Sequence, residues 1–123
     1  MQEPLAKPVL FVKHGCPFCL KVRLFLLEAG LLDKVELREA SIPDEEERLR
    51  NELSAHVDKV SFPTARFGTD DYLTESDDII ARFAAVSGTQ PERLPTFRAY
   101  VDGPFAQLLA LYRENANLKK RAG

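Results

Sequence analysis

The stretch His14-Gly15-Cys16-Pro17-Phe18-Cys19 contains both cysteines of the 123-residue chain, three positions apart. An apolar run at 9–12 precedes it and fits a buried strand, and an apolar run at 20–29 follows it and fits a helix. Two cysteines with this spacing at a strand-to-helix junction are typical of a redox-active thiol pair. If Cys16 begins the helix, unpaired backbone N–H groups and the helix dipole stabilise its thiolate. We therefore predict that Cys16 is the nucleophile and that Cys19, one turn further and more buried, is the resolving thiol.

Length and composition predict a single domain over residues 1–123. The net charge of −2 and the pI near 5.7 argue against nucleic acid or an anionic membrane as the main partner. No apolar run approaches the roughly 20 residues of a membrane span, and no signal-peptide pattern is visible. Two cysteines are too few for a disulfide-stapled secreted scaffold, so we expect a cytoplasmic protein with a working thiol pair.

Hydrophobic patterning predicts four strands, at 9–13, 34–40, 60–67 and 72–73. Phe62-Pro63 belongs near the start of the third strand, because proline cannot donate a hydrogen bond to a neighbouring strand. The turn signal at 68–71 joins the third and fourth strands into a hairpin. Residues 1–8 carry two prolines and are expected to form a loose lead-in.

Four helical segments are predicted, at about 18–29, 44–57, 76–87 and 97–112. Ser41 and Ser76 are the expected N-caps of the second and third helices, and Gly103-Pro104 is expected to break or kink the last one. This order predicts an α/β fold in which a compact mixed sheet has helices on both faces. We expect a core at about 9–88 and a C-terminal helical extension at about 92–118.

Three separated segments resemble the glutaredoxin family and, equally, the thioredoxin-like N-terminal domain of glutathione transferases. They are Lys13 with Cys16-Pro17-Phe18-Cys19, then Phe62-Pro63, which is similar to the cis-proline site of the thioredoxin fold, and then Leu73-Thr74-Glu75-Ser76-Asp77-Asp78-Ile79. The resemblance spans roughly residues 9–87. It implies a thioredoxin-like, glutaredoxin-type four-stranded mixed sheet, here with an extra C-terminal helix, and a glutathione-dependent thiol–disulfide oxidoreductase.

The resemblance also implies where glutathione would bind as a co-substrate. The backbone of Phe62 would pair with the cysteinyl unit, Lys13 would face the glycine carboxylate, and the start of the third helix would hold the γ-glutamyl end. A helix N-terminus with a hydroxyl suits a carboxylate, and an acidic side chain suits an α-amino group. The glutathione-binding residues implied in this way are Lys13, Phe18, Phe62, Pro63, Glu75, Ser76 and Asp77.

The two families differ in what they imply. The motif at 16–19 with Lys13 resembles a dithiol glutaredoxin, whereas residues 19–31 and Glu75-Ser76 are more similar to a glutathione transferase. Phe62 stands where a glutaredoxin usually has a β-branched residue, and its bulk would narrow or reshape the groove. A full transferase carries its second-substrate site on an all-helical C-terminal domain. Only about thirty residues follow the third helix here, so we expect that site to be missing or truncated.

Each signal has a simpler interpretation as well. The cysteines could be an inert pair, half of a zinc site or the ligands of a bridged iron–sulfur cluster. The spacing to His14 and His56 matches no standard zinc site, and Pro17 usually accompanies redox chemistry, so no metal is expected. Lys13 could be an ordinary surface lysine, Phe62 a core residue, and the residues at 76–77 helix caps.

The expected partners are glutathione and disulfide or glutathionylated protein substrates, with no nucleic acid and no membrane. The alternatives are a transferase-like module that binds glutathione without redox turnover, and a transferase-related protein that acts on electrophiles. The last helix is expected to pack on the domain or to form a homodimer face. Its aromatic residues are Phe97, Tyr100, Phe105 and Tyr112.

Overall fold

The computed structural model describes residues 4–122 and contains a four-stranded sheet with the order β2-β1-β3-β4. β1 runs parallel to β2 and antiparallel to β3, and β3 runs antiparallel to β4. This is the mixed sheet that the sequence predicts. The strands are β1 (Pro4–Lys13), β2 (Glu36–Ala40), β3 (Thr64–Gly68) and β4 (Asp71–Leu73).

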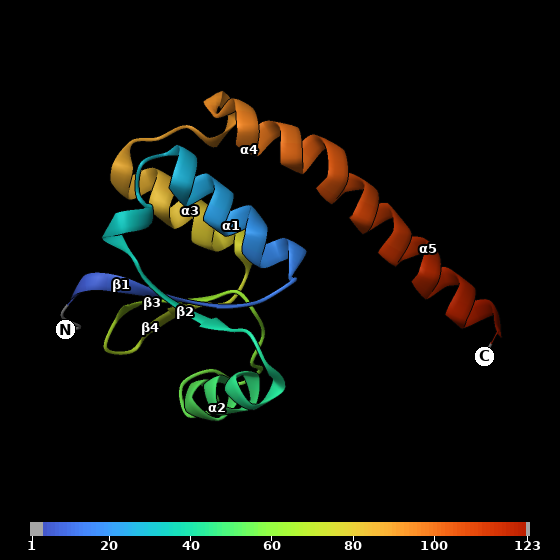
Figure 1. Ribbon diagram of the computed structural model, residues 1–123, viewed down its shortest axis with the longest axis horizontal. Coiled ribbons are helices and arrows are strands. Elements are labelled where there is room, and N and C mark those ends of the chain that lie inside the picture. Colours follow the sequence, from blue (N-terminus) through green and yellow to red (C-terminus); the bar gives the residue numbers. More distant parts are fainter. Residues whose placement is uncertain (1–3, 123) are drawn as a thin grey trace.

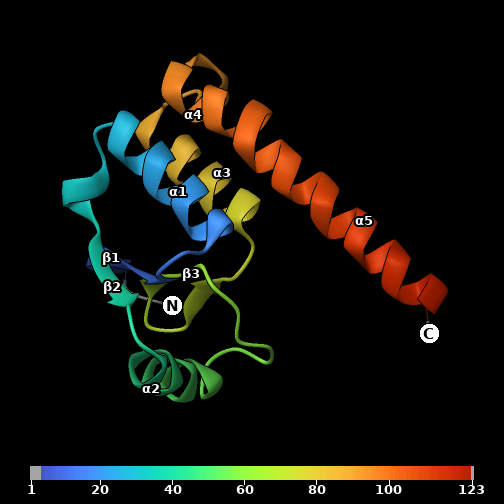
Figure 2. The same ribbon diagram turned by 45° about the vertical axis from the view of Figure 1, so that its right-hand side comes forward.

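Helices cover both faces of the sheet. Figure 1 shows α1 and α3 on one face and α2 on the other, while α5 runs away from the sheet towards the C-terminus (Figures 1 and 2). The helices are α1 (Pro17–Glu28), α2 (Pro43–Ser54), α3 (Ser76–Ser87), α4 (Pro95–Tyr100) and α5 (Ala106–Ala122). Two short 3₁₀ turns lie at Leu32–Lys34 and Pro91–Arg93. Within residues 4–122, no helix combines the length and the apolar character that a membrane crossing requires.

The core lies between the sheet and the helices α1 and α3. Leu10 and Val12 of β1 and Phe25 of α1 are fully buried there, as is Ile79 of α3. The apolar positions of α1 therefore recur at the helical spacing that the sequence indicates. On the other face, Leu49 and Leu53 of α2 are buried.

The predicted loose lead-in at 1–8 is wrong for residues 4–8, and residues 1–3 lie outside the part that the structure describes. β1 already begins at Pro4, which pairs with Gly68 of β3. The register shifts between Pro4 and Val9, so this part of the ladder is irregular. Such an irregularity accommodates Pro8, which has no N–H for a regular ladder.

The predicted N-caps are also wrong by one residue. Ile42 caps α2 and Glu75 caps α3, and both have extended backbones. Ile42 precedes Pro43, and a residue before proline is excluded from the helical region by its neighbour's ring. The capping hydrogen bonds come from Glu45 instead of the expected Ser41. The Glu45 carboxylate accepts hydrogen bonds from the backbone N–H groups of Ser41 and Ile42 at 3.0 and 3.2 Å.

The expected break at Gly103-Pro104 is a change of helix type. Residues Val101–Phe105 form one π-helical turn between α4 and α5. In a regular α-helix, the N–H of residue 104 would bond to the carbonyl of Tyr100, and proline lacks that N–H. The chain therefore widens its helix for one turn and continues as α5.

Two polar contacts fasten α4 to opposite ends of α1. At one end, the carboxylate of Glu28 accepts the backbone N–H groups of Thr96 and Phe97 at 3.0 and 2.7 Å. At the other end, the hydroxyl of Tyr100 donates to the carbonyl of Pro17 at 2.8 Å. Between them, the ring of Phe97 packs edge-on against that of Phe25, with 5.7 Å between the centroids. The segment after α3 is thereby bound to the helix that carries the cysteines.

Candidate functional site

Cys16 is the N-cap of α1, so the condition for a stabilised thiolate is met, and Pro17 occupies the first helical position. Gly15 has a φ of +76°, a conformation that glycine adopts without strain, and it turns the chain from β1 into α1. The thiol therefore lies where the first N–H groups of the helix have no partners within the helix.

The two cysteines are free thiols with very different environments. Cys19 is buried, whereas Cys16 is partly exposed. The hydrogen bond from the Cys19 thiol lowers the pKa of Cys16 from 9.0 to about 6, although burial acts in the opposite direction. Backbone N–H groups of Cys19 and Phe18 and the charge of Lys13 also lower it. The same thiol–thiol bond, together with burial, raises the pKa of Cys19. One sulfur is therefore prepared to attack while the other stays protonated.

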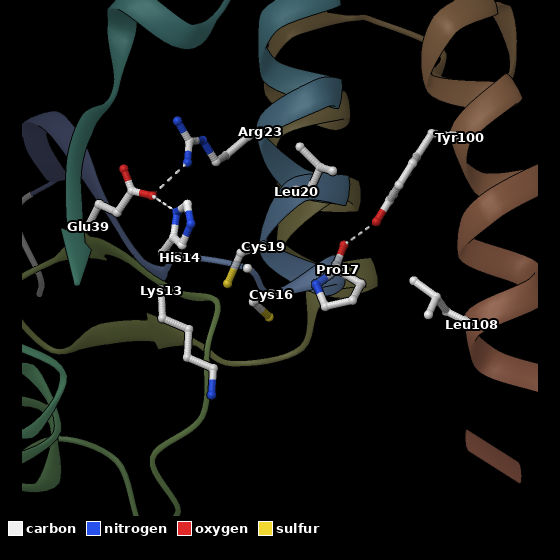
Figure 3. A pocket seen from close by; sticks show the side chains of 11 residues that line it. Lys13, His14, Cys16, Pro17, Cys19, Leu20, Arg23, Glu39, Tyr100 and Leu108 are labelled. Carbon is white, nitrogen blue, oxygen red and sulfur yellow. Dashed lines mark hydrogen bonds and ion pairs between the residues drawn. The ribbon is translucent and has the colours of Figure 1, made fainter. Parts of the chain in front are cut away.

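A cavity of about 370 Å³ opens beside Cys16 (Figure 3). It is lined by Lys13, His14, Gly15, Cys16, Pro17, Cys19, Leu20, Arg23, Glu39, Tyr100 and Leu108. Tyr100 and Leu108 come from α4 and α5 and face the thiol pair from the far side of the cavity. The residues after α3 therefore form one wall of the cavity that contains the thiol pair. The apolar pattern of the last helix was the signal for this wall, but not for its position.

A small group of charges lies at the rim of this first cavity. Glu39 accepts from Arg23 at 3.1 Å, and its carboxylate lies 3.9 Å from Nδ1 of His14 (Figure 3). His14 is largely exposed, as expected for a loop histidine. Lys13 also lines the first cavity but, within the described part of the chain, forms no ion pair with His14, Arg23 or Glu39.

A second cavity of about 320 Å³ lies between α1, the loop before β3 and the start of α3. It gathers six of the predicted glutathione-binding residues, namely Phe18, Phe62, Pro63, Glu75, Ser76 and Asp77. Lys13, the seventh, lines the first cavity. Five further residues line the second cavity and are missing from the predicted set, namely Lys21, Ser61, Thr74, Phe105 and Leu109.

The Phe62–Pro63 peptide bond is cis, as the resemblance implies. The Cys16 thiol points to the carbonyl oxygen of Phe62, with 3.9 Å between sulfur and oxygen. The Phe62 side chain is buried in the core, and the guanidinium of Arg50 lies 5.1 Å from the ring centre. The backbone at Phe62 is thus held next to the reactive sulfur.

Ser76 is the first residue of α3 and is buried. Asp77 follows it and accepts a hydrogen bond from Nζ of Lys21 at 2.7 Å. Hydroxyl, carboxylate and ammonium groups therefore meet at this helix N-terminus, where anions are favoured. Among residues 4–122, no three His, Cys, Asp or Glu side chains are grouped so that they could hold a metal ion.

Comparison with known families gives a match to the glutathione S-transferase N-terminal domain over residues 15–86, which is more than half of the chain. The match begins at the turn before Cys16 and ends in α3. A search of curated protein sequences gives no match.

Solved structures of glutathione transferases share the fold. A glutathione S-transferase from the Antarctic clam Laternula elliptica is 24% identical, covers 69% of this chain and has a TM-score of 0.57. Glutathione transferases Omega 2C and Omega 3C from Trametes versicolor are 18% and 22% identical, cover 88% and 82% of this chain, and have TM-scores of 0.53. This chain spans 37%, 46% and 44% of the lengths of these three structures, respectively.

Proposed function

This chain belongs to the family of glutathione S-transferase N-terminal domains, and from that premise we propose that it is a glutathione-dependent thiol–disulfide oxidoreductase. Its substrates are disulfides and glutathionylated protein thiols, and glutathione is the co-substrate. The observation that carries the proposal is the thiol pair, in which Cys16 has a pKa of about 6 and Cys19 is buried beside it. At pH 7 roughly nine-tenths of Cys16 is then the thiolate, which is the form that attacks disulfides.

The reaction is a sequence of thiol–disulfide exchanges. The Cys16 thiolate attacks the glutathione sulfur of a mixed disulfide, a Cys16–glutathione disulfide forms, and the substrate leaves as a thiolate that takes up a proton. A second glutathione thiolate then attacks the glutathione sulfur of this intermediate, which releases oxidised glutathione and restores Cys16. In the alternative resolving step, Cys19 loses its proton and attacks Cys16, glutathione leaves, and the resulting Cys16–Cys19 disulfide is reduced by two further glutathione molecules.

The second cavity supports a binding role for the residues that the sequence predicts. The backbone of Phe62, beside the Cys16 sulfur, would pair with the cysteinyl unit of glutathione. Ser76, with Asp77 and Glu75, would hold the γ-glutamyl end at the start of α3. Lys13 lies on the other side of Cys16, where a positive charge favours the thiolate.

The test is glutathione-dependent reduction of the mixed disulfide of glutathione and 2-mercaptoethanol by wild type, Cys16→Ser and Cys19→Ser. We expect Cys16→Ser to lose activity, because a serine hydroxyl is not ionised at neutral pH. Cys19→Ser retains activity if the second glutathione resolves the intermediate, and loses it if Cys19 does. Full activity of Cys16→Ser would contradict the proposal.

A second candidate is a transferase-type module that binds glutathione without redox turnover, or that conjugates glutathione to electrophiles. The family match favours it, because the matched family is that of transferases. It predicts binding of S-methylglutathione without any disulfide reduction. It also predicts a Cys16 pKa near the free-thiol value of about 8.5. A conjugation assay with 1-chloro-2,4-dinitrobenzene identifies the electrophile-directed form.

Two further predictions concern the setting of the protein. A cytoplasmic location suits a free thiol pair, because glutathione keeps thiols reduced there.

A homodimer through the C-terminal helix is predicted from the large apolar side chains that α5 exposes. Sedimentation velocity measures the oligomeric state. These side chains are Leu111, Tyr112 and Leu118.

A further inference from the structure

Lys21 combines a positive charge with a buried position. Among the side chains of residues 7–121, it is the only charged one that is buried, with 6% of its side chain exposed. Removing an ammonium group from water is costly unless other groups replace its hydration. The neighbours of Lys21 therefore indicate what the charge is for.

The ammonium group of Lys21 lies between a carboxylate and two aromatic rings. Its Nζ is 2.7 Å from Oδ1 of Asp77, 4.6 Å from the ring centre of Phe105 and 5.9 Å from that of Phe18. The aromatic faces favour a cation at these distances. The side chain of Asp77 is 88% exposed, so the ion pair connects the interior with the open end of the second cavity.

The second cavity is lined by charged groups of both signs. Lys21 supplies one positive group, Glu75 and Asp77 supply two negative groups, and Ser76 supplies a hydroxyl. An ammonium group has three N–H donors, of which one is directed at Asp77. A ligand with one carboxylate and one ammonium group, as at the α-carbon of an amino acid, matches this pattern in both signs.

We propose that Lys21 is a specificity-determining residue that binds the α-carboxylate at the γ-glutamyl end of glutathione, while Asp77 and Glu75 bind the α-amino group. This assignment rests on the proposed function. Lys21 lines the cavity together with Ser76, the first residue of α3, so a carboxylate bound there would meet the ammonium group and the N-terminus of that helix. A peptide without the α-carboxylate would leave the buried ammonium with Asp77 alone.

An ion pair that serves only to hold α1 against α3 would behave differently. It would change the stability of the fold without distinguishing between ligands. Lys21→Met tests this difference, because it keeps an apolar side chain of similar length and removes the buried charge. Asp77 is exposed, so it regains water as its partner and the fold is expected to persist.

The experiment compares two ligands by isothermal titration calorimetry. One is S-methylglutathione, whose blocked thiol excludes disulfide exchange, and the other is the same tripeptide without the α-carboxylate. We expect Lys21→Met to bind S-methylglutathione about tenfold more weakly than wild type, as for the loss of one charged hydrogen bond. Its affinity for the decarboxylated peptide should equal that of wild type. Lys21→Arg should keep the preference for the carboxylate, and Lys34→Met, at an exposed lysine, is the control.

The outcomes separate this assignment from the proposed function. Equal losses for both ligands would assign Lys21 a purely structural role and overturn the inference. Unchanged affinity for S-methylglutathione in Lys21→Met would also overturn it, while leaving the oxidoreductase proposal standing. A wild-type protein that binds neither ligand would overturn both. A wild-type protein that binds glutathione selectively through Lys21 but reduces no disulfide would support this inference and reject the redox function.

Discussion

At the scale of single residues, the hydrogen bond between the two thiols has the largest influence on the acidity of Cys16. The Cys19 thiol donates to the Cys16 sulfur, and this bond is a stronger cause of the lowered pKa than the backbone N–H groups or Lys13. The resolving residue is therefore also the residue that activates the nucleophile. Its burial keeps it protonated and able to donate.

Replacing Cys19 should therefore make Cys16 less acidic. We expect Cys19→Ala to move the pKa of Cys16 from about 6 towards the free-thiol value near 8.5. Cys19→Ser keeps a hydroxyl donor and should fall between the two. The measurement is the rate of iodoacetamide alkylation as a function of pH. A midpoint that stays near 6 in Cys19→Ala would show that the helix N-terminus and Lys13 set the acidity without the Cys19 thiol.

The same pKa gives the pH dependence of the first step, the attack of Cys16 on the mixed disulfide. Cys16 is a thiolate above a pH of about 6 and becomes protonated as the pH falls through that value. In a single-turnover experiment without added glutathione, the rate of this attack should thus be nearly constant at pH 7–8, where Cys16 is ionised, and should fall about tenfold per unit below pH 6. A single-turnover rate that keeps rising up to pH 9 would indicate an unperturbed Cys16 thiol.

The residues of the site differ in how far the sequence identifies them. Cys16 and Cys19 are evident from their spacing, and the residues at 75–77 from their place before a helical pattern. Lys21 was missed because a lysine in an amphipathic helix ordinarily faces solvent. Its burial depends on Phe105, which is 84 positions away and contacts it only in the folded chain.

At the scale of secondary-structure elements, Glu28 caps α4 from a different helix. Its carboxylate accepts two of the first N–H groups of α4, which have no partners within that helix. Burial alone would raise the pKa of Glu28, but the backbone N–H groups of Thr96 and Phe97, together with the Thr96 hydroxyl, outweigh it and hold the pKa below 4.5. The stabilisation is therefore present at neutral pH and is lost as the pH falls through this lowered pKa.

Glu28→Ala should loosen α4 while leaving the sheet intact. We expect faster hydrogen exchange at the amides of Thr96 and Phe97 and a lower melting temperature at pH 7. Below the folded-state pKa of Glu28, the wild-type protein should approach the variant. Glu47→Ala, at an exposed glutamate of α2, is the control. Unchanged protection at Thr96 and Phe97 would contradict a capping role for Glu28.

Element types were predictable because the periodicity of apolar residues is local. The ends of the elements were less predictable, because they depend on contacts with side chains from other parts of the chain. Ser41 has the right chemistry for a cap, but Pro43 places the extended residue at Ile42 and Glu45 satisfies the N–H groups. The attachment of α4 depends on Glu28, which is 68 positions from Thr96 and which no local pattern could indicate.

At the scale of the whole molecule, the C-terminal segment has a packed part and an exposed part. Phe97 and Phe105 are buried, whereas all residues from 110 to 121 are exposed. The predicted extension at about 92–118 thus contains two regions with different contributions to stability. The difference can be measured because hydrophobic stabilisation scales with the apolar area removed from water.

At concentrations where sedimentation velocity shows a monomer, truncation after Arg113 should change the free energy of unfolding by less than about 0.5 kcal/mol, because it removes exposed residues only. Phe97→Ala should cost about 3–5 kcal/mol, the usual range for a buried phenylalanine. Urea denaturation measures both variants, and their m-values show whether unfolding remains two-state. A large loss that appears only at concentrations where the protein is a dimer would support the proposed homodimer through α5, and a large loss in the monomer would contradict the prediction.

The position of Tyr100 and Leu108 has a consequence for the order in which the protein is made. During synthesis, all four strands have left the ribosome once residue 73 has emerged. The helix that carries the thiols, α1, emerges well before that point. The wall of the first cavity comes later, with Tyr100 and Leu108. For the synthesis time of some thirty residues, about 2–6 seconds at ordinary elongation rates, the nascent chain presents its most acidic thiol without that wall. During that interval the cavity beside Cys16 is open on the side that Tyr100 and Leu108 later close.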